Sequence, residues 1–493
     1  MSTRSALTAI VWLALALSAI VWIMRISSAV ALDRPFLGNT SGCEEEALFS
    51  VWKAANGYEV YNNPWLPPFS ASYFGWLFYQ VYGWWAKAGL AVSGLEDAWL
   101  PTFTRIFTLI GLLACIGVFY RLLQTGANRG ATFPPSLLFG LAALVFINPL
   151  FHWWAFTTRA DVWALAWELA ALLAAFCYAK SGRARAVVLV GVFAFLAWSF
   201  RQTNISVLAG FGLWLLVNRR WKVLLPMVAS MAVAFGVTMA VLGMNFIDSA
   251  FTANALSGDM RSSVAIANAS SALTKDPLLT LALGAAFVLV FFAGKWWHNN
   301  ASRLAFLVAA TSVFLAAALA AKVGASSNYY LPPAALVPLF VLVALSRCEF
   351  PSFLNAGFIG AGAAGIGLAS ALVLSGASGN LRSPGDERLH EMRALRRELR
   401  EPVFSTDRVV NLPWILGNGP ESYVFGYAYQ RMLAAKPEKF TGGTIADLLR
   451  GGRFSTLITL EDSASYVATA EELADFTSAG GTVREVRKRE GGL

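Results

Sequence analysis

The sequence predicts an α-helical membrane protein that crosses the bilayer many times. Hydrophobic residues make up 57% of the 493 residues and charged residues only 14%, and the mean hydropathy is +0.56. Soluble domains carry about 25% charged residues. Apolar runs also recur at roughly the length of about 20 residues that a helix needs to cross the hydrocarbon layer. Both observations favour a polytopic helical membrane protein.

Eleven apolar segments are expected to span the membrane. They are 6–24, 102–120, 134–156, 160–179, 186–200, 204–218, 223–244, 277–294, 304–321, 331–346 and 353–375. The segments 186–200 and 204–218 are short, so a re-entrant pair is an alternative to two crossings. Together with their connecting loops, the spans predict a transmembrane module over residues 1–379.

The placement of basic residues predicts the topology. The chain holds 38 Lys and Arg against 29 Asp and Glu, a formal charge of +9, and the excess lies in the membrane part. Cytoplasmic loops are enriched in Lys and Arg, so this charge reflects topology and does not indicate a nucleic-acid partner. The amino terminus is then inside, and residues from about 380 lie outside the cytoplasmic membrane. The basic loops contain Arg121 and Arg129; Lys180, Arg183 and Arg185; Arg219, Arg220 and Lys222; Lys295 and Arg303; and Arg347.

The first outer loop, residues 31–101, is expected to lie along the membrane. Its segment from Phe69 to Leu95 is long enough to span and carries only Lys87 as a charge. A crossing there would move every later basic loop to the outer side, against the positive-inside rule. Aromatic residues with a polar tip suit the headgroup level, so we expect an interfacial helix. Its aromatic residues are Trp76, Tyr79, Tyr82, Trp84 and Trp85.

Residues 380–493 are expected to form a small soluble α/β domain. Short apolar runs predict strands at 402–406, 455–460 and 482–487. Helices are expected near 421–435, 444–450 and 464–478, and Leu389, Met392, Leu395 and Leu399 lie near helical spacing in a further segment. This alternation is typical of an α/β arrangement.

The sequence does not indicate a nucleotide site or a metal site. Gly360 to Gly365, GAGAAG, matches the dinucleotide pattern, but no strand precedes it, and small residues let membrane helices approach closely. The three histidines, His152, His298 and His390, are scattered, and no cluster of His, Cys and Asp has ligand spacing.

Ionisable residues in or beside spans are functional candidates, because burying them is costly. In TTRADVWALAWELA, Arg159 and Asp161 begin the fourth span, and Glu168 lies two turns deeper on the same face. Asp161 is alternatively a first-turn carboxylate behind the capping candidates Thr157 and Thr158.

Glu168 needs a charged partner or a wet cavity, and Lys322 or Arg201 is available, so a structural ion pair is an alternative to a catalytic role. A run of three glutamates follows the first span, and a solvated first helical turn is an alternative to a functional role for it. The polar residues expected near one outer face are Glu44, Glu45, Glu46, Arg159, Asp161, Arg201, Gln202 and Lys322.

The segment EEEALFSVWKAANGYEVYNNPWLPPFSASYFGWLFYQVYG resembles the first outer loop of GT-C type membrane glycosyltransferases, in particular bacterial relatives of protein mannosyltransferases and of the aminoarabinose transferase of lipid A. That family has an Asp-Glu-Ala-like motif, a Gly-x-x-x-Tyr turn, a Pro-Pro pair and an interfacial helix. Glu45-Glu46-Ala47, Gly57 to Tyr61 and Pro67-Pro68 follow in that order. Glu45 stands where aspartate is usual, so the register stays open among the three glutamates.

Further segments extend the resemblance over most of the chain. TTRADVWALAWELA is similar to the family's Arg-x-Asp at its fourth span, FRQTN to its Lys-Gln-Thr stretch, and SSNYYLP to its Asn-Tyr segment. EPVFSTD and GGRFSTLITLED in the tail look like the family's outer α/β domain.

The resemblance implies a GT-C-like fold and an inverting glycosyltransferase of the bacterial inner membrane. A polyprenyl-phosphate-linked sugar would be the donor, and an envelope glycan, lipid or protein the acceptor. Glu45 is then the expected base and Asp161 orients the acceptor or the sugar. The resemblance implies no obligatory metal, and a divalent metal stays open. The residues expected to bind the donor and its phosphate are Arg159, Arg201, Gln202, Lys322, Tyr329 and Tyr61.

A secondary transporter or a flippase for lipid-linked sugars is the main alternative, because Glu168 and Lys322 could serve ion coupling. Against it, the sequence shows no inverted repeat, and the long interfacial loop with an outer domain suits a processing enzyme better. A structural member of an envelope complex is a third hypothesis.

Overall fold

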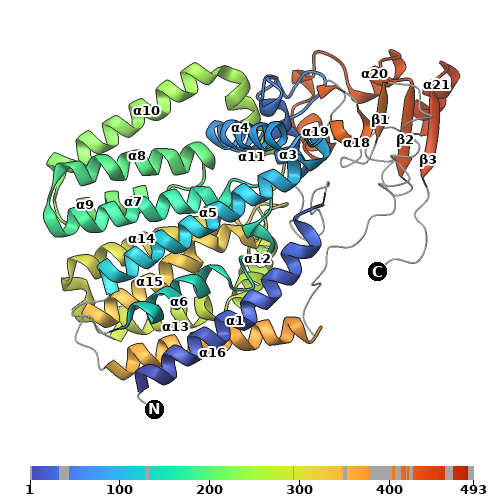
Figure 1. Cartoon of the computed structure of the whole chain (residues 1–493). Coiled ribbons are helices and arrows are strands. Elements are labelled where there is room, and N and C mark those ends of the chain that lie inside the picture. Colours follow the sequence, from blue (N-terminus) through green and yellow to red (C-terminus); the bar gives the residue numbers. More distant parts are fainter. Residues whose placement is uncertain are drawn as a thin grey trace.

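The computed structural model describes residues 3–32, 44–127, 133–292, 294–347, 352–376, 402–405, 412–417, 419–420, 426–460 and 470–486. A helical bundle forms most of the molecule, and a small parallel sheet lies beyond one end of it (Figure 1). The helices of the bundle are α1 Thr3–Ala29, α5 Leu100–Leu122, α6 Pro135–Phe146, α7 Asp161–Ser181, α8 Ala184–Phe200, α9 Ser206–Val217, α10 Trp221–Ile247, α12 Ser262–Lys275, α13 Pro277–Phe292, α14 Asn300–Leu319, α15 Leu331–Arg347 and α16 Ser352–Leu374.

Each of the eleven expected spans overlaps one helix of this bundle. Within the described residues, seven helical segments are long and apolar enough to cross a membrane, namely those of α1, α5, α7, α10, α14, α15 and α16. The other four spans lie on shorter helices, or on one that is bent against its neighbour. The helices α6, α8 and α9 hold 10 to 17 residues, and α12 meets α13 at a bend of 105°. The expected span 134–156 is too long, because α6 ends at Phe146.

The glycines of α16 serve helix packing. A side chain at Gly362 would meet Leu278 of α13 at 2.5 Å, and one at Gly367 would meet Ala14 of α1 at 3.4 Å. The hydroxyls of Ser18 and Ser370 also join α1 to α16, at 2.7 Å. The GAGAAG motif therefore lies on a membrane helix that packs closely on two others, as the sequence predicts.

A layer of shorter elements covers the end of the bundle that is remote from the amino terminus (Figure 1). It contains α3 Glu44–Ala55, α4 Trp76–Ser93 and α11 Asn254–Leu256. Helix α4 is not one of the seven spanning segments found among the described residues, which fits the expected interfacial helix. Its aromatic side chains divide by position, because Tyr79 and Tyr82 are buried whereas Trp84 and Trp85 are 62% and 37% exposed.

The carboxyl-terminal strands are β1 Val403–Ser405, β2 Thr456–Leu460 and β3 Thr482–Val486, which pair in parallel in that order. The accompanying helices are α18 Pro413–Leu416, α19 Gly426–Ala435, α20 Ile445–Arg450 and α21 Ala470–Ser478. These elements agree with the predicted strands and overlap the predicted helices. The helix expected around Leu389 to Leu399 lies outside the described residues.

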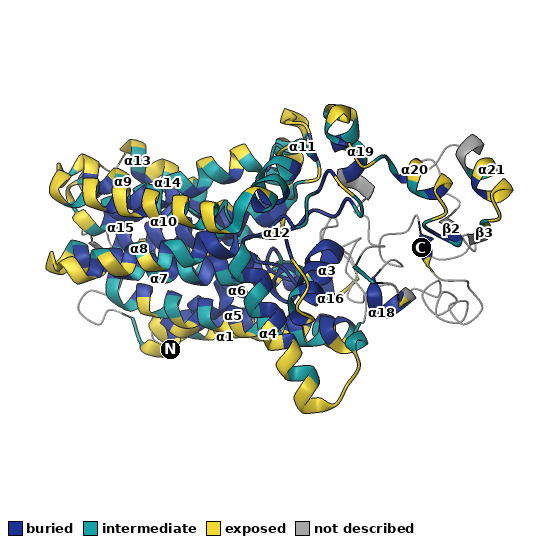
Figure 2. Cartoon of the chain, turned by 90° about the horizontal axis from the view of Figure 1, so that it is seen from above, coloured by how far each residue is buried: buried dark blue, intermediate teal, exposed yellow. Residues whose placement is uncertain are grey.

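This part of the chain packs directly on the first outer loop. The ring of Phe69 lies 4.9 Å from that of Tyr429, and Trp65 meets Phe440 edge-on at 5.6 Å. Seen from above, the dark blue buried residues continue from the bundle into this contact (Figure 2). The loop is therefore held between the bundle on one side and the carboxyl-terminal helices on the other.

Gly75 fixes the loop against the bundle at one narrow point. Its N–H donates to the carbonyl of Phe200 at 3.0 Å, and a Cβ there would lie 2.1 Å from the carbonyl oxygen of Ser199. Gly75→Ala should lower the free energy of unfolding by about 1–3 kcal/mol, because backbone atoms must move. Gly236→Ala is the matched control, since nothing lies within 4 Å of its Cβ position. Thermal unfolding in detergent measures both, and equal midpoints for the two variants would contradict the prediction.

Candidate functional site

The three glutamates at the start of α3 are buried, with exposed fractions of 0%, 0% and 1% for Glu44, Glu45 and Glu46. The interpretation of a solvated first helical turn is therefore wrong. Successive helical residues are turned by about 100°, so the three carboxylates leave α3 in different directions. Each must be stabilised by its own surroundings, because an isolated buried carboxylate is costly.

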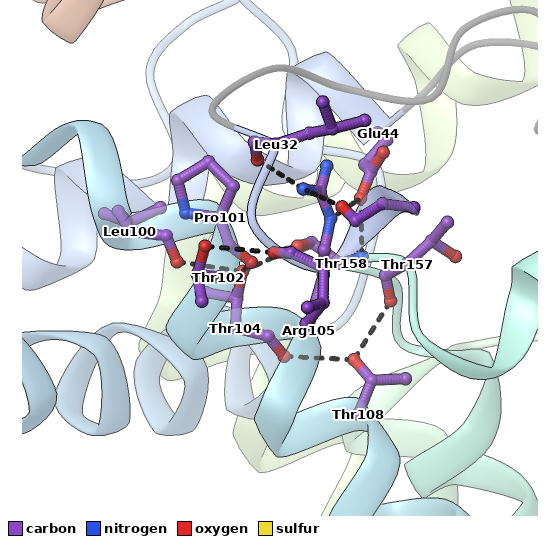
Figure 3. Close-up of polar contacts among 12 residues, drawn as sticks. Leu32, Glu44, Leu100, Pro101, Thr102, Thr104, Arg105, Thr108, Thr157 and Thr158 are labelled. Carbon is purple, nitrogen blue, oxygen red and sulfur yellow. Dashed lines mark hydrogen bonds and ion pairs between the residues drawn. The ribbon is translucent and has the colours of Figure 1, made fainter. Parts of the chain in front are cut away.

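Glu44 is held by an ion pair and a backbone donor. The Nε atom of Arg105 lies 3.4 Å from its Oε1, and the N–H of Thr158 donates to the same oxygen at 2.8 Å (Figure 3). Arg105 is itself fully buried and also donates to the carbonyls of Ala29, at 3.2 Å, and Leu32. One guanidinium thus joins the end of α1, helix α5 and the first turn of α3.

Sequence reasoning missed Arg105, although its signal was available. This arginine lies inside the expected span 102–120, and a charge within a span requires a partner. The first acidic run outside that span begins at Glu44, which is the partner that the structure provides.

Glu46 accepts hydrogen bonds from two hydroxyls, that of Tyr79 at 2.7 Å and that of Ser50 at 2.9 Å. Burial raises the pKa of its carboxyl to about 8, although both hydroxyls act in the opposite direction. Burial thus favours the protonated form of Glu46 relative to an ordinary carboxyl. Lys53 lies two turns further along the same helix. Its amine donates to the carbonyl of Val60 at 2.6 Å and to the side-chain oxygen of Asn62 at 2.7 Å. Burial lowers the pKa of this amine to about 8.

A second charged cluster surrounds Asp161 at the start of α7. Its carboxylate accepts from Arg201, from the Nε of Arg159 at 3.0 Å and from the Nδ2 of Asn328 at 2.7 Å. Three of the predicted residues are therefore brought together, and Asn328 is an addition. The expected caps are wrong, because Ala160 is the N-cap of α7 and Thr158 pairs with Thr104 at 2.7 Å.

Arg201 faces an aromatic ring and a small cavity. Its guanidinium lies 4.6 Å from the ring centre of Tyr329, a cation–π contact. The adjoining cavity, which Asn204 and Tyr329 also line, has about 20 Å³ of space, enough for about one water molecule. Next to Arg201 in sequence, the buried Nε2 of Gln202 has no hydrogen-bond partner in the part of the chain that the structure describes.

The remaining predicted residues lie around these clusters with other partners. Glu168 accepts from Asn204 at 3.2 Å and from the N–H of Val207 at 3.3 Å, so the expectation that Lys322 or Arg201 pairs with it is wrong. Lys322 contacts Asn254 instead, donating to its side-chain oxygen at 2.7 Å.

Tyr61 is part of the aromatic packing of the outer loop. Its hydroxyl donates to the carbonyl of Phe74 at 2.8 Å, and its ring meets those of Tyr79 and Phe246 edge-on. The side chain is buried, and its contacts with Phe74, Tyr79 and Phe246 hold the loop.

The two clusters meet at the same end of the bundle. Glu44 is bound by the N–H of Thr158, three residues before Asp161. Phe74 connects Arg159 to the surroundings of Glu46. Its ring covers Arg159 at 5.4 Å, and its N–H donates at 3.0 Å to the hydroxyl of Tyr79, which donates to Glu46. Within the described ranges, no group of three or more His, Cys, Asp or Glu residues could hold a metal ion.

Arg105→Met should destabilise the fold, because it leaves Glu44 charged in apolar surroundings. Removing one partner of a buried ion pair costs about 3–5 kcal/mol. The double variant Glu44→Gln/Arg105→Met should lose less than Arg105→Met alone. Arg121→Met on the same helix is the control, since Arg121 is exposed. Thermal unfolding of the three variants tests this, and an unchanged midpoint for Arg105→Met would refute the role of the pair.

The free energy of unfolding should depend on pH through Glu46 and Lys53. A carboxyl with its pKa raised from 4.5 to about 8 destabilises the folded state as pH rises through that range, because the folded state holds the proton longer. An amine with its pKa lowered from 10.5 to about 8 has the opposite effect from pH 8 upward. The unfolding midpoint should therefore pass through a minimum near pH 8.

Two variants separate the limbs of this profile. Glu46→Gln should remove the decline between about pH 5 and 8, and Lys53→Met should remove the rise above pH 8. Midpoints measured across this range in one detergent give the answer. A profile that keeps both limbs in both variants would assign the pH dependence to other groups.

Comparisons with known proteins give structural likeness only. No protein-family model matches the chain, and no curated protein matches it. The crystal structure of ArnT from Cupriavidus metallidurans bound to undecaprenyl phosphate aligns over 97% of this chain and 90% of that chain, with 16% identity and a TM-score of 0.47.

Two archaeal structures are also similar. AglB, the oligosaccharyltransferase of Archaeoglobus fulgidus in complex with an inhibitory peptide and a dolichol-phosphate, aligns over 84% of this chain and 64% of that chain, with 13% identity and a TM-score of 0.48. An oligosaccharyltransferase structure from the same organism with Zn and sulfate aligns over 84% and 62%, with 13% identity and a TM-score of 0.49. ArnT, an aminoarabinose transferase, and AglB are GT-C type membrane glycosyltransferases, the group that the sequence motifs of this chain resemble.

Proposed function

We propose that this chain is an inverting membrane glycosyltransferase that uses a sugar linked to a polyprenyl phosphate. One observation carries the proposal: the buried carboxylates of α3 and the arginines around Asp161 lie at the same end of an apolar helical bundle. The acceptor would be an envelope glycan, lipid or protein on the outer side of a bacterial inner membrane, with residues from about 380 on that side. The motif resemblance described above points to the same chemistry.

Transfer with inversion makes two demands on a site. A base must accept the proton of the acceptor hydroxyl while the oxygen attacks the anomeric carbon. The bond from that carbon to the phosphate oxygen breaks as the new bond forms, and cations must stabilise the departing lipid phosphate. A carboxylate and guanidinium groups at the end of a membrane bundle meet both demands.

Glu45 is the best candidate for the base. Glu44 is neutralised by Arg105 and accepts from Thr158, so its carboxylate serves as a structural anchor. Glu46 already accepts hydrogen bonds from the hydroxyls of Tyr79 and Ser50, so its carboxyl serves to hold the outer loop. In the motif resemblance Glu45 stands where the family has its aspartate, although the register stays open among the three glutamates.

Arg159 and Arg201 would hold the phosphate. Both contact the single carboxylate of Asp161, which fixes them side by side. Since its carboxylate accepts from Arg159, Arg201 and Asn328, we assign Asp161 to positioning the arginines and not to orienting the sugar. Lys322 and Gln202 would contribute from the rim. The cavity beside Arg201 has room for about one water molecule, so a phosphate that entered it would displace lining side chains, Tyr329 among them.

Glu45→Gln should lower the rate of sugar transfer by about 100- to 10,000-fold, because general base catalysis contributes a factor of that size. The amide is nearly isosteric, so thermal unfolding and binding of undecaprenyl phosphate should stay unchanged. Glu96→Gln is the matched control, since Glu96 is exposed in the same loop. The assay follows loss of labelled sugar from a polyprenyl-phosphate-linked pool in membranes.

The same membranes test the alternative of a transporter. Sealed vesicles that accumulate the labelled lipid-linked sugar on the opposite leaflet without transferring it would favour a flippase. A Glu45→Gln protein with full transfer activity would remove this residue from the mechanism.

A further inference from the structure

Two apolar grooves flank helix α8 at the end of the bundle opposite to the candidate site. The first has about 540 Å³ of space and lies between α5, α7 and α8, with Val118, Leu173 and Phe193 among its lining residues. The second has about 680 Å³ and lies between α8 and α10, with Val188 and Met227 among its lining. Both volumes fall in the range of about 300–1,000 Å³ that is usual for ligand sites.

The two grooves converge on the turn between α7 and α8. Ser181 and Arg183 line the first groove, and Gly182 and Ala184 line the second. Figure 1 shows this turn at the end of the bundle remote from the carboxyl-terminal strands. A ligand with its polar group at the turn could therefore place apolar chains on both sides of α8.

Positive charge concentrates at the mouth of the first groove. Lys180, Arg183 and Arg185 all line it, and all three are exposed. Among the described residues, none of the three forms an ion pair, and no acidic residue lines either groove. Lys222 adds a further cation at the second groove. The site would thus attract an anion without first breaking an internal contact.

The start of α8 adds backbone N–H donors that point toward the same turn. The first N–H groups of a helix have no partner within it and bind anions readily. The N-cap residue of this 17-residue helix, Arg183, makes no side-chain cap, and the N–H of Ala186 donates to the carbonyl of Arg183 at 3.0 Å. The N–H groups of Ala184 and Arg185 lie at the same place as the basic side chains. An anionic group here would receive both backbone and guanidinium donors.

We propose that the turn between α7 and α8 and its two grooves form a binding site for an anionic phospholipid of the surrounding membrane. The phosphate lies against Lys180, Arg183 and Arg185, and the acyl chains lie in the grooves on either side of α8. Basic pockets between membrane helices on the cytoplasmic side bind such headgroups, whereas a soluble phosphate would leave the grooves unused. The site is separate from the proposed transfer chemistry and does not depend on it.

The test compares lipid binding by the full chain in detergent, measured by native mass spectrometry. Phosphatidylglycerol should bind more tightly than phosphatidylcholine of the same acyl chains. Arg183→Gln/Arg185→Gln should weaken phosphatidylglycerol by about 25-fold, since each basic residue near an anionic lipid contributes about a factor of five. Arg219→Gln/Arg220→Gln removes equal charge at the same end, outside both grooves, and should change the affinity by less than about twofold.

A second pair of variants tests the grooves themselves. Ala170→Phe fills the first groove and should weaken phosphatidylglycerol with every basic residue in place. Leu189→Gln, on an exposed lining residue, tests the same groove with little risk to folding, and thermal unfolding without lipid checks both variants. Unaltered binding in these two variants would overturn the grooves as acyl-chain sites.

Other outcomes would overturn the assignment of the ligand. Equal losses in the two arginine pairs would show general attraction to a basic surface, without a site. Tighter binding of undecaprenyl phosphate than of phosphatidylglycerol, lost in Arg183→Gln/Arg185→Gln, would make the site one for the carrier lipid. Competition by inorganic phosphate alone, with no effect of acyl-chain length, would show a headgroup contact only.

Discussion

The ion pair of Glu44 with Arg105 is the interaction on which the outer end of this protein depends. Both groups are fully buried, so neither can be solvated if the other is displaced. Arg105 reaches the last carbonyls of α1, and Glu44 reaches the backbone before α7. The first turn of α3 is thereby fixed relative to three helices. Glu45 and Glu46 are in the interior because their neighbour is anchored there.

The charges at this end have distinct surroundings, and this separates their chemistry. Glu44 is neutralised by a guanidinium, and burial raises the pKa of Glu46 to about 8. Asp161 instead meets two guanidinium groups, so positive charge dominates there. Phe74 and Tyr79 lie between Arg159 and Glu46, because the ring of Phe74 covers Arg159 and its N–H donates to the hydroxyl of Tyr79, which donates to Glu46. An attacking hydroxyl and a departing phosphate need just such a division.

The helices of the bundle could be predicted because the length of an apolar run and the charge of a loop are local patterns in the sequence. The Asp161 cluster could be predicted because few polar residues lie at the predicted outer face of the membrane. The burial of Glu44 to Glu46 could not, since a run of acids at a helix start is equally compatible with water, and only the chain that covers it decides. The predicted partner of Glu168 was wrong for a related reason. The donors to Glu168 are the side chain of Asn204 and the backbone N–H of Val207. Neither donor is charged, so the pattern of charged residues in the sequence does not reveal them.

The contact of Phe69 with Tyr429 and Phe440 has a consequence for biosynthesis. The loop that follows the first span receives its aromatic cover from residues about 360 positions later in the chain. While the membrane spans are still being synthesised, the aromatic rings of this loop lack their carboxyl-terminal contacts. The candidate centre can therefore mature only when translation is nearly over, so a prematurely terminated chain would insert into the membrane without acquiring a finished outer loop.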